Sequence, residues 1–266
     1  MLYSLTAASQ TVQSQWFSIG SVPSATAESV NGFLNHISMK FGRTVLAYII
    51  NMVDGNGNCV MHYSVSNCNF EVMKVILKTG LADADIRNKV GYTPTMLAAL
   101  CDAPSAEDKK VLRLLLFHAD VNVTATQAGQ TALMLAVAHN KQEMVNLLLE
   151  ANCAVNLQDF DGSTALMSAA EHNHVDIVKL LLDHPDIDVS LKDQDGSTAL
   201  DIALEYGHEE TAELLYAFEK SSPRQRYSSV QRSSNNRHIP PSARSRNSQR
   251  SSSYSSSRSS SFQRPI

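Results

Sequence analysis

The chain has 266 residues, of which 43% are hydrophobic and 18% charged, so it is long enough to bury the core of one or two domains. No apolar run approaches the roughly 18 residues of a membrane-spanning helix, and no basic, apolar leader opens the chain, which excludes an integral membrane protein and indicates a cytoplasmic one. The formal net charge of −4 combines an acidic part before residue 221 with a basic part after it.

The acidic part contains an internal repeat. Five glycines recur at spacings of 34, 38, 33 and 34 residues. Each is followed by a similar short sequence that contains apolar residues, and then by a second apolar run. These glycines are Gly57, Gly91, Gly129, Gly162 and Gly196. A period of this length predicts an all-α solenoid of about five units, in which each unit buries its apolar face against its neighbours.

The sequence of each unit predicts a turn followed by two short helices. A Thr two residues after the glycine, such as Thr131 or Thr164, can cap the first helix with its hydroxyl, and Pro94 suits the first helical position. Asn140 and Asn173 occupy the turn between the helices, where a residue that tolerates the left-handed conformation is needed. The repeated methionines of the first helices, Met96, Met134 and Met167, are predicted to pack in the core.

The second unit carries an insertion around residues 102–110, which accounts for its spacing of 38. We expect Pro104 to end the first helix of this unit, and Ser105 with Glu107 and Asp108 to start the second. A longer loop between helices is tolerated at the surface, so the insertion either flanks a binding groove or is a neutral difference in length.

Residues 221–266 differ in composition from everything before them. They hold nine Arg, no acidic residue and many Ser, whereas residues 1–220 hold 26 acidic residues against 13 basic ones, a formal charge of −13. A segment with so few large apolar side chains cannot bury enough surface to order itself, so disorder is predicted there.

No pattern indicates a catalytic, metal or cofactor site. The cysteines are scattered without a CxxC pair, which favours reduced, packed thiols. The turn at Asp54–Asn58 fails as a calcium loop because Cys59 stands where Gly is required, and His172 with His174 lacks a third ligand for a metal. We predict that the protein is not an enzyme and needs no cofactor.

The sequences of several repeats resemble those of one protein family. The stretches are DGNGN…MHYSVS from Asp54, GYTPTMLAAL from Gly91, QAGQTALMLAV from Gln127 and DGSTALM from Asp161. The unit of about 33 residues resembles the ankyrin repeat, and these phrases resemble the C-terminal ankyrin domain of the KANK family. That resemblance covers about residues 28–219 and implies that residues 24–53 form a helical cap.

The predicted organisation therefore has four parts. They are a disordered N-terminus at residues 1–23, the helical cap at 24–53, an ankyrin-repeat domain at 54–220 and a disordered Ser/Arg-rich tail at 221–266. Neither the KN motif nor the coiled coils of the KANK family are recognisable in this sequence, so the contacts of those regions are not expected here.

In a curved array, the turn tips and the exposed side of each first helix line a groove that suits a peptide. The register also places His172, Glu205 and Tyr206 in this groove. The predicted partner-binding residues are Tyr92, Leu97, Leu100, Tyr63, Asn67, Gln130, His139, Phe160 and Glu171. Tyr92 is the first choice among them because aromatic rings on an otherwise polar surface often anchor a protein partner. For Leu97 and Leu100, packing against the next repeat is an equal alternative.

Two classes of function follow from these features. The first is a non-catalytic adaptor that binds a protein peptide and no small-molecule substrate; the family resemblance implies a kinesin-4 motor segment as the partner and a role in actin and microtubule organisation near the cell cortex. The second is association with RNA or other phosphates through the basic tail. Nucleic acid is not expected to bind any other part of the chain.

Overall fold

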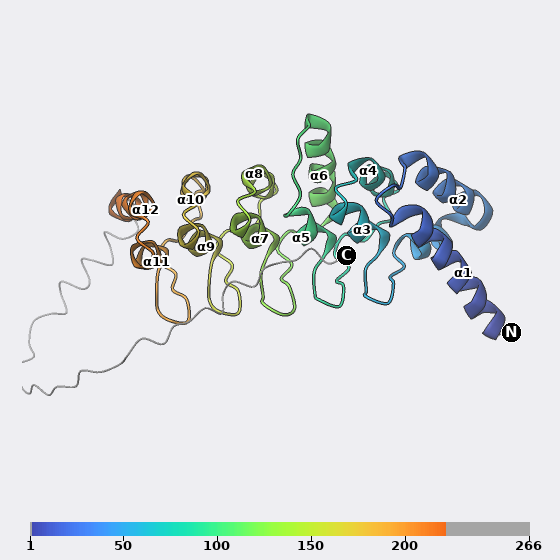
Figure 1. The fold of residues 1–266 in the computed structure, drawn as a ribbon, viewed down its shortest axis with the longest axis horizontal. Helices are drawn as coiled ribbons and strands as arrows, with labels where there is room; N and C mark the ends of the chain where they lie inside the picture. The colour runs from blue at the N-terminus through green and yellow to red at the C-terminus, as the bar shows by residue number, and fades with distance from the viewer. Residues whose placement is uncertain (1, 222–266) are drawn as a thin grey trace, which may run out of the picture. The chain divides into compact units, whose positions relative to one another are not determined.

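The computed structural model describes residues 2–221 and confirms the predicted all-α solenoid (Figure 1). Within these residues it contains twelve helices and no strands, with one isolated β-bridge between Val53 and Cys59. The helices are α1 Leu2–Gly20, α2 Ala27–Ile50, α3 Val60–Ser66, α4 Phe70–Lys78, α5 Pro94–Ala98, α6 Ala106–His118, α7 Ala132–Ala138, α8 Gln142–Glu150, α9 Ala165–Glu171, α10 Val175–Leu182, α11 Ala199–Glu205 and α12 Glu209–Ser221. The tail predicted to be disordered lies outside the described residues, apart from Ser221.

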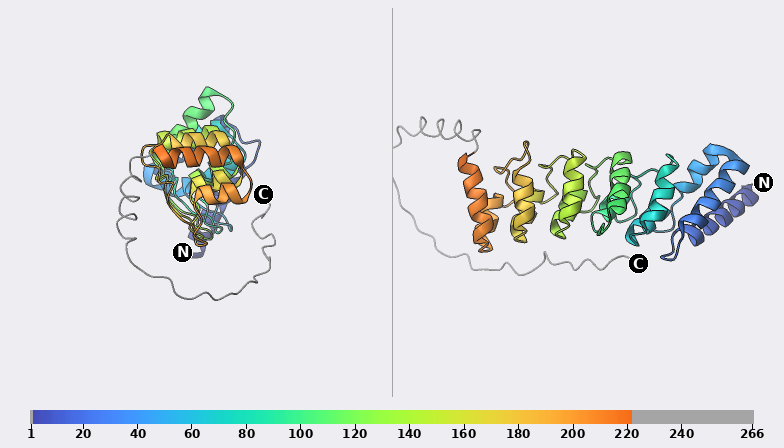
Figure 2. Two further views of the ribbon diagram at one scale, coloured as in Figure 1. Left: turned by 90° about the vertical axis from the view of Figure 1, so that its left-hand side faces the viewer. Right: turned by 90° about the horizontal axis from the view of Figure 1, so that it is seen from above.

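The helix pairs stack in a row. The first helices, α3, α5, α7, α9 and α11, form one layer, the second helices form another, and loops extend from the first layer (Figure 1). Seen from above, the second helices lie side by side along the row (Figure 2). Each pair packs on the next, so the buried aliphatic and methionine side chains of successive pairs make one continuous core.

Threonine side chains start most of the first helices, as predicted. The hydroxyl oxygens of Thr93, Thr131, Thr164 and Thr198 each accept a hydrogen bond from the backbone N–H three residues later, at 3.2–3.3 Å. These bonds satisfy donors that a helix N-terminus leaves without partners. The methionines three residues after Thr93, Thr131 and Thr164 are buried, which confirms that they belong to the core.

The turns between paired helices need a left-handed residue, and the structure confirms this for Asn140 and Asn173, with φ of 53° and 54°. Gly207 has the same conformation in the last unit, with φ of 72°. Cys68 adopts it in the first unit, with φ of 50°, a position that sequence analysis did not identify. The cysteine at this position has a backbone conformation that residues other than Asn and Gly rarely adopt.

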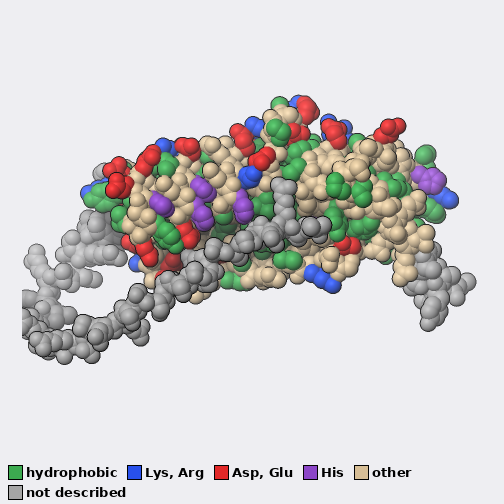
Figure 3. Space-filling model, viewed as in Figure 1, with side chains coloured by type: hydrophobic (Ala, Val, Ile, Leu, Met, Phe, Trp, Pro, Cys, Tyr) green, Lys and Arg blue, Asp and Glu red, His purple; other side chains and the backbone are tan. Residues whose placement is uncertain are grey.

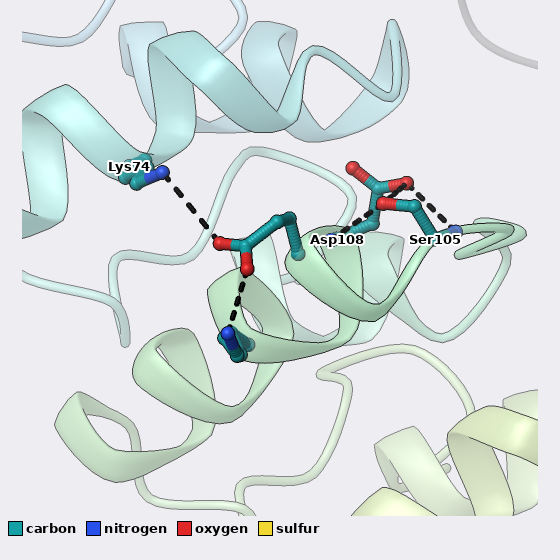
Figure 4. Close-up of polar contacts among 5 residues, drawn as sticks. Lys74, Ser105 and Asp108 are labelled. Atoms are coloured by element: carbon teal, nitrogen blue, oxygen red, sulfur yellow. Dashed lines mark hydrogen bonds and ion pairs between the residues drawn. The ribbon is translucent and has the colours of Figure 1, made fainter.

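Helix α6 begins as predicted. Ser105 caps it by accepting a hydrogen bond from the Asp108 N–H at 3.1 Å, while the Asp108 carboxylate accepts one from the Ser105 N–H at 3.0 Å (Figure 4). Glu107 lies between Lys74 of α4, at 4.0 Å, and Lys110, at 2.6 Å. The prediction for Pro104 was wrong, because α5 ends at Ala98 and Pro104 lies in the loop that follows.

Residues 1–23 were predicted to be disordered, but the structure forms helix α1 over Leu2–Gly20. Trp16 anchors this helix: its side chain is 0% exposed and stacks on Phe33 of α2, with ring centroids 5.4 Å apart. The sequence of α1 is uncharged and rich in Ser, Thr and Gln, so its composition resembles that of a disordered segment. Its order depends on a contact with a residue far along the chain.

Helix α2 occupies most of the segment assigned to the cap. Thr26 caps its N-terminus, and Gly42, with φ of 80°, bends it. Beyond the bend, Leu46 and Ile49 face the core, whereas Tyr48 is exposed. The helix therefore covers the apolar side of the first repeat by packing on α4.

Candidate functional site

Loops project from the N-terminal ends of the first helices and are tied to one another. The Lys89 N–H donates to the Asn56 carbonyl at 2.9 Å, the Phe160 N–H to the Ala128 carbonyl at 3.0 Å, and the Gln194 N–H to the Asp161 carbonyl at 2.9 Å. These bonds join the loop before α3 to the loop before α5, and the loops before α7, α9 and α11 to one another. We call this row of loops the loop shelf.

Phe160 is the large exposed ring of this shelf, with 60% of its surface accessible. A Cβ added to Gly129 would come within 2.6 Å of the Phe160 Cδ1, so the ring lies directly against the bare backbone of Gly129. Support on one face and exposure of the other suit a side chain that anchors a partner. The prediction that Phe160 is accessible is consistent with this geometry.

At the opposite ends of the first helices, a regular row of side chains remains accessible. We call this row the helix-end strip and define it as Asn67, Leu100, His139, Glu171, His172 and Tyr206. Asn67, His139, His172 and Tyr206 are the C-cap residues of α3, α7, α9 and α11, so equivalent positions in four repeats supply it. The rest of α7 is buried up to Val137, which leaves only the helix ends open to a partner.

Rings stack in pairs along the strip. His172 lies over His174, with centroids 5.6 Å apart, and Tyr206 lies over His208, with centroids 6.0 Å apart. The Tyr206 hydroxyl reaches the Glu171 carboxylate at 3.3 Å, which links the fourth repeat to the fifth. Figure 3 shows histidine side chains gathered on this face over α7 to α11.

The inner rings of these pairs bond to backbone atoms of the preceding repeat. His174 Nδ1 lies 2.9 Å from the Val137 carbonyl, and His208 Nε2 lies 3.0 Å from the Glu171 carbonyl. Burial lowers the pKa of His174 below its usual value, which favours the neutral ring. The strip offers aromatic faces and hydrogen-bonding groups together with the Glu171 carboxylate, and acidic side chains are prominent along the second helices (Figure 3).

Of the predicted binding residues, His139, Glu171, Leu100 and Asn67 lie together in the strip, and Phe160 lies on the loop shelf. Gln130 is half-buried, and its carbonyl accepts a hydrogen bond from the Ala125 N–H at 2.8 Å. His172 and Tyr206 complete the strip; the groove register included them, but they were left out of the predicted binding set. Their equivalence to His139 as C-cap residues is the signal that would have found them.

At the N-terminal end of the array, α1 covers part of the predicted site. The Tyr63 ring meets the edge of Phe17, with centroids 6.1 Å apart, and its hydroxyl donates to the Asp54 carboxylate. The Asn67 side-chain amide donates to the Ser21 carbonyl at 3.3 Å. Tyr63 and Asn67 thus make contacts within the chain that sequence analysis, which expected no ordered N-terminal segment, did not include.

Tyr92 and Leu97 do not stand on the rim as predicted. Each is only 9% exposed, so the expectation of an accessible anchor at Tyr92 was wrong. The Tyr92 backbone is fixed on both sides, because its N–H donates to the Asn88 side chain at 2.9 Å and its carbonyl lies 3.2 Å from His62 Nε2. For Leu97 the structure favours the alternative of packing, whereas Leu100 is half-buried and reaches the surface.

A hollow of about 290 Å³ lies between the insertion and α8. Its lining includes Asp102, Pro104 and Lys141, and the Lys141 ammonium pairs with the Asp102 carboxylate at 2.6 Å. The hollow is next to the strip, because Lys141 follows Asn140 and His139 in the chain. Over the part of the chain that the structure describes, no three His, Cys, Asp or Glu side chains are placed to hold a metal ion.

No helix among residues 2–221 has the length and apolar character needed to cross a bilayer.

Comparisons with known proteins identify the repeats. The model of the family described as "Ankyrin repeats (3 copies)" matches residues 28–125, 82–159, 102–193 and 133–226. Regulatory protein NPR1 of Arabidopsis thaliana is 38% identical over 78 residues, or 29% of this chain and 12% of that protein. The putative ankyrin repeat protein FPV031 of Fowlpox virus (strain NVSL) is 33% identical over 96 residues, or 35% of this chain and 27% of that protein.

The nuclear factor NF-kappa-B p105 subunit of Gallus gallus is 32% identical over 117 residues, or 42% of this chain and 11% of that protein. The chain thus spans about a quarter or less of the curated relatives it matches. A crystal structure of EF0377, an ankyrin repeat protein, superposes with a TM-score of 0.60 and 28% identity, covering 71% of this chain and 91% of the other. Because the family model matches repeats across residues 28–226, well over half of the length, the chain belongs to the ankyrin-repeat family.

Proposed function

We propose that this protein is a non-catalytic adaptor that binds a segment of a partner protein along the helix-end strip, with Phe160 as a second anchor. Ankyrin repeats generally mediate protein–protein interaction, and proteins built from them are typically non-catalytic.

The recurrence of accessible rings at equivalent helix ends carries the proposal. His139, His172 and Tyr206 stand at the ends of α7, α9 and α11, and each is exposed; α7 and α9 are largely buried, whereas α11 buries only Ala199, Ile202 and Ala203. Side chains held by packed helices at regular intervals lose little freedom on binding, which favours affinity for an extended segment. Imidazole and phenol groups supply both stacking surface and hydrogen bonds.

The resemblance to the KANK ankyrin domain suggests a partner. It favours a segment of a kinesin-4 motor, and with it a role in actin and microtubule organisation in the cytoplasm near the cell cortex. The charge supports a partner with basic residues around an apolar anchor, because residues 1–220 carry −13. The buried Tyr92 and Leu97 support the scaffold in this account, and the accessible residues of the strip make the contacts.

Calorimetry with a kinesin-4 tail peptide tests the proposal. We expect Phe160→Ala and a double variant His172→Ala with Tyr206→Ala each to weaken binding about tenfold or more, which corresponds to about 1.4 kcal/mol. Phe117→Ala is the matched control, because Phe117 is 82% exposed on α6 and belongs neither to the strip nor to the shelf. Equal affinity of the wild type, the Phe160→Ala variant and the His172→Ala, Tyr206→Ala double variant would reject the surface, and no binding at all would reject the partner.

The composition of the tail supports a second candidate, the association with RNA or other phosphates. Nine Arg without an acidic residue after Lys220 would contact phosphates without sequence preference. The full chain and a truncation after Lys220 should then differ in RNA affinity, and only the full chain should lose affinity steeply as salt increases. Equal RNA affinity of the two chains would remove this function.

A further inference from the structure

Two cysteines of adjacent repeats lie in contact. Cys68 ends the turn between α3 and α4, and Cys101 follows α5 in the next repeat; their Sγ atoms are 3.1 Å apart although the residues are 33 positions apart in the chain. All four cysteines of the chain are thiols in this structure. A disulfide bond is about 2.05 Å long, so a closer approach of about 1 Å would bring the two sulfurs to bonding distance.

The surroundings give the two thiols different access. Cys68 is half-buried in the turn, so a small solute can reach it, whereas Cys101 is 6% exposed and its thiol lies 3.1 Å from the Val65 carbonyl. Cys68 also occupies the left-handed position that Asn140 and Asn173 fill in later repeats. The fold does not need a cysteine there, because Asn meets the same backbone requirement.

The other two cysteines are an internal contrast. Cys59 and Cys153 are buried, and burial raises the pKa of each thiol to about 11. Only the thiolate attacks a disulfide, so these two side chains react slowly at neutral pH. Cys68 differs from both in access, because its side chain is half-buried and theirs are buried.

We propose that Cys68 and Cys101 are a site of reversible oxidation, at which a low-molecular-weight disulfide such as oxidised glutathione joins the first repeat to the second through a protein disulfide. This proposal is independent of the partner peptide. It concerns two side chains that the proposed adaptor function does not use.

The reaction takes two exchange steps. The Cys68 thiolate attacks one sulfur of oxidised glutathione, forming a mixed disulfide while the glutathione S–S bond breaks and the first glutathione leaves as a thiolate. The Cys101 thiolate then attacks the Cys68 Sγ, forming the protein disulfide and releasing the second glutathione. Two protein thiols are oxidised, one glutathione disulfide is reduced to two thiols, and the two protons pass to the leaving thiolates or the solvent.

The bond would fix one end of the helix-end strip. Cys68 follows Asn67 and Cys101 follows Leu100, both of which belong to the strip. Closing a loop between residues 33 positions apart restricts the unfolded chain, so the oxidised form should unfold at a higher temperature. Thiol reagents would therefore change the rigidity of this end of the array while leaving the later repeats unchanged.

The test is to incubate the full chain with oxidised glutathione, block remaining thiols with N-ethylmaleimide and map the peptides by mass spectrometry. Trypsin and chymotrypsin together separate the cysteines, because chymotrypsin cleaves after Tyr63, between Cys59 and Cys68. We expect a peptide pair joined through Cys68 and Cys101, with Cys59 and Cys153 alkylated, and loss of the joined pair after dithiothreitol. Alkylation of both Cys68 and Cys101, or a stable glutathione adduct on Cys68, would overturn the proposal.

Variants connect the bond to stability. Oxidation should raise the Tm of the wild type by about 5 °C or more, and Cys68→Asn should abolish both the joined peptide and this increase. Asn is chosen because it serves the same turn at positions 140 and 173, so the variant keeps the fold. Cys153→Ser is the control that should retain both effects; an equal increase in Tm in Cys68→Asn would overturn the proposal.

Discussion

The first repeat and the fourth repeat build the same unit by different means. In the fourth, Thr164 caps α9 with its own hydroxyl, at 3.2 Å from the Met167 nitrogen, and Asn173 makes the turn. In the first, Cys59 stands at the cap, and its N–H instead donates to His62 Nδ1 at 3.1 Å. Both caps use a residue three positions later, but in the first repeat that residue is a buried imidazole whose Nε2 also lies 3.2 Å from the Tyr92 carbonyl of the second repeat.

The two repeats also differ in what covers them. Helices α1 and α2 pack on the first, so its Tyr63 and Asn67 make contacts with the N-terminal segment. The fourth leaves Glu171 and His172 accessible. Local capping rules therefore govern the open part of the array, and contacts between distant residues govern the covered part.

The largest expected effect tests the covered end. Trp16→Ala should lower the free energy of unfolding by about 3–5 kcal/mol, because Trp16 is wholly buried and stacks on Phe33. Urea unfolding followed by circular dichroism measures this, since Trp16 is the only tryptophan and its fluorescence is lost in the variant. Gln15→Ala, at an exposed neighbouring position, is the control; a similar small loss in both variants would contradict the anchoring of α1 by Trp16.

The second prediction concerns the pH dependence of stability that arises from two histidines, His62 and His174. Burial lowers the pKa of His62, and burial also lowers that of His174, so each folded-state pKa lies below the unfolded value of about 6.5. The unfolded chain then binds protons more readily, and stability is lost as pH falls below about 6.5 through the folded pKa values. Urea midpoints between pH 8 and 5 should decrease, and less so in a His62→Gln, His174→Gln double variant; equal slopes would contradict this origin.

The third prediction tests local capping in the open repeats. Thr164→Ala should cost about 1 kcal/mol, because a donor at the start of α9 loses its partner. Thr44→Ala, at an exposed position within α2, is the matched control and should change stability little. Equal effects in thermal unfolding would show that the hydroxyl contributes nothing specific.

The smallest effect concerns the left-handed turn. Asn140→Gly should change the free energy of unfolding by less than about 0.5 kcal/mol, whereas Asn140→Ala should lose about 1 kcal/mol, because φ at this position is 53°. Chemical denaturation of both variants measures the difference. If Ala and Gly were equally stable there, the turn would not require the left-handed conformation.

These contrasts explain which features the sequence could predict. The threonine caps, the Asn turns and the start of α6 at Ser105 follow from residues within a few positions of one another, so a repeat pattern reveals them. The order of α1 depends on Trp16 meeting Phe33, and the burial of Tyr92 depends on packing around its loop. Neither contact has a local signature.

The positions of the residues in the proposed surface were predictable to the same degree. The helix register places His139, Glu171 and His172 on one edge because it is periodic. The register cannot distinguish an apolar side chain that reaches solvent from one that packs on the next repeat, so it left both alternatives open for Leu97, which is buried, and for Leu100, which is half-buried. The contact between Cys68 and Cys101 also depends on stacking, and their separation in the chain conceals it.

The most direct test of the proposed surface is hydrogen exchange of the full chain with and without the kinesin-4 peptide, followed by mass spectrometry. We expect slower exchange in segments around His139, His172 and Tyr206 and in the loop around Phe160, with no change in α2 or the outer end of α6. Slower exchange confined to α2 and α6, with the helix-end strip unchanged, would contradict the account.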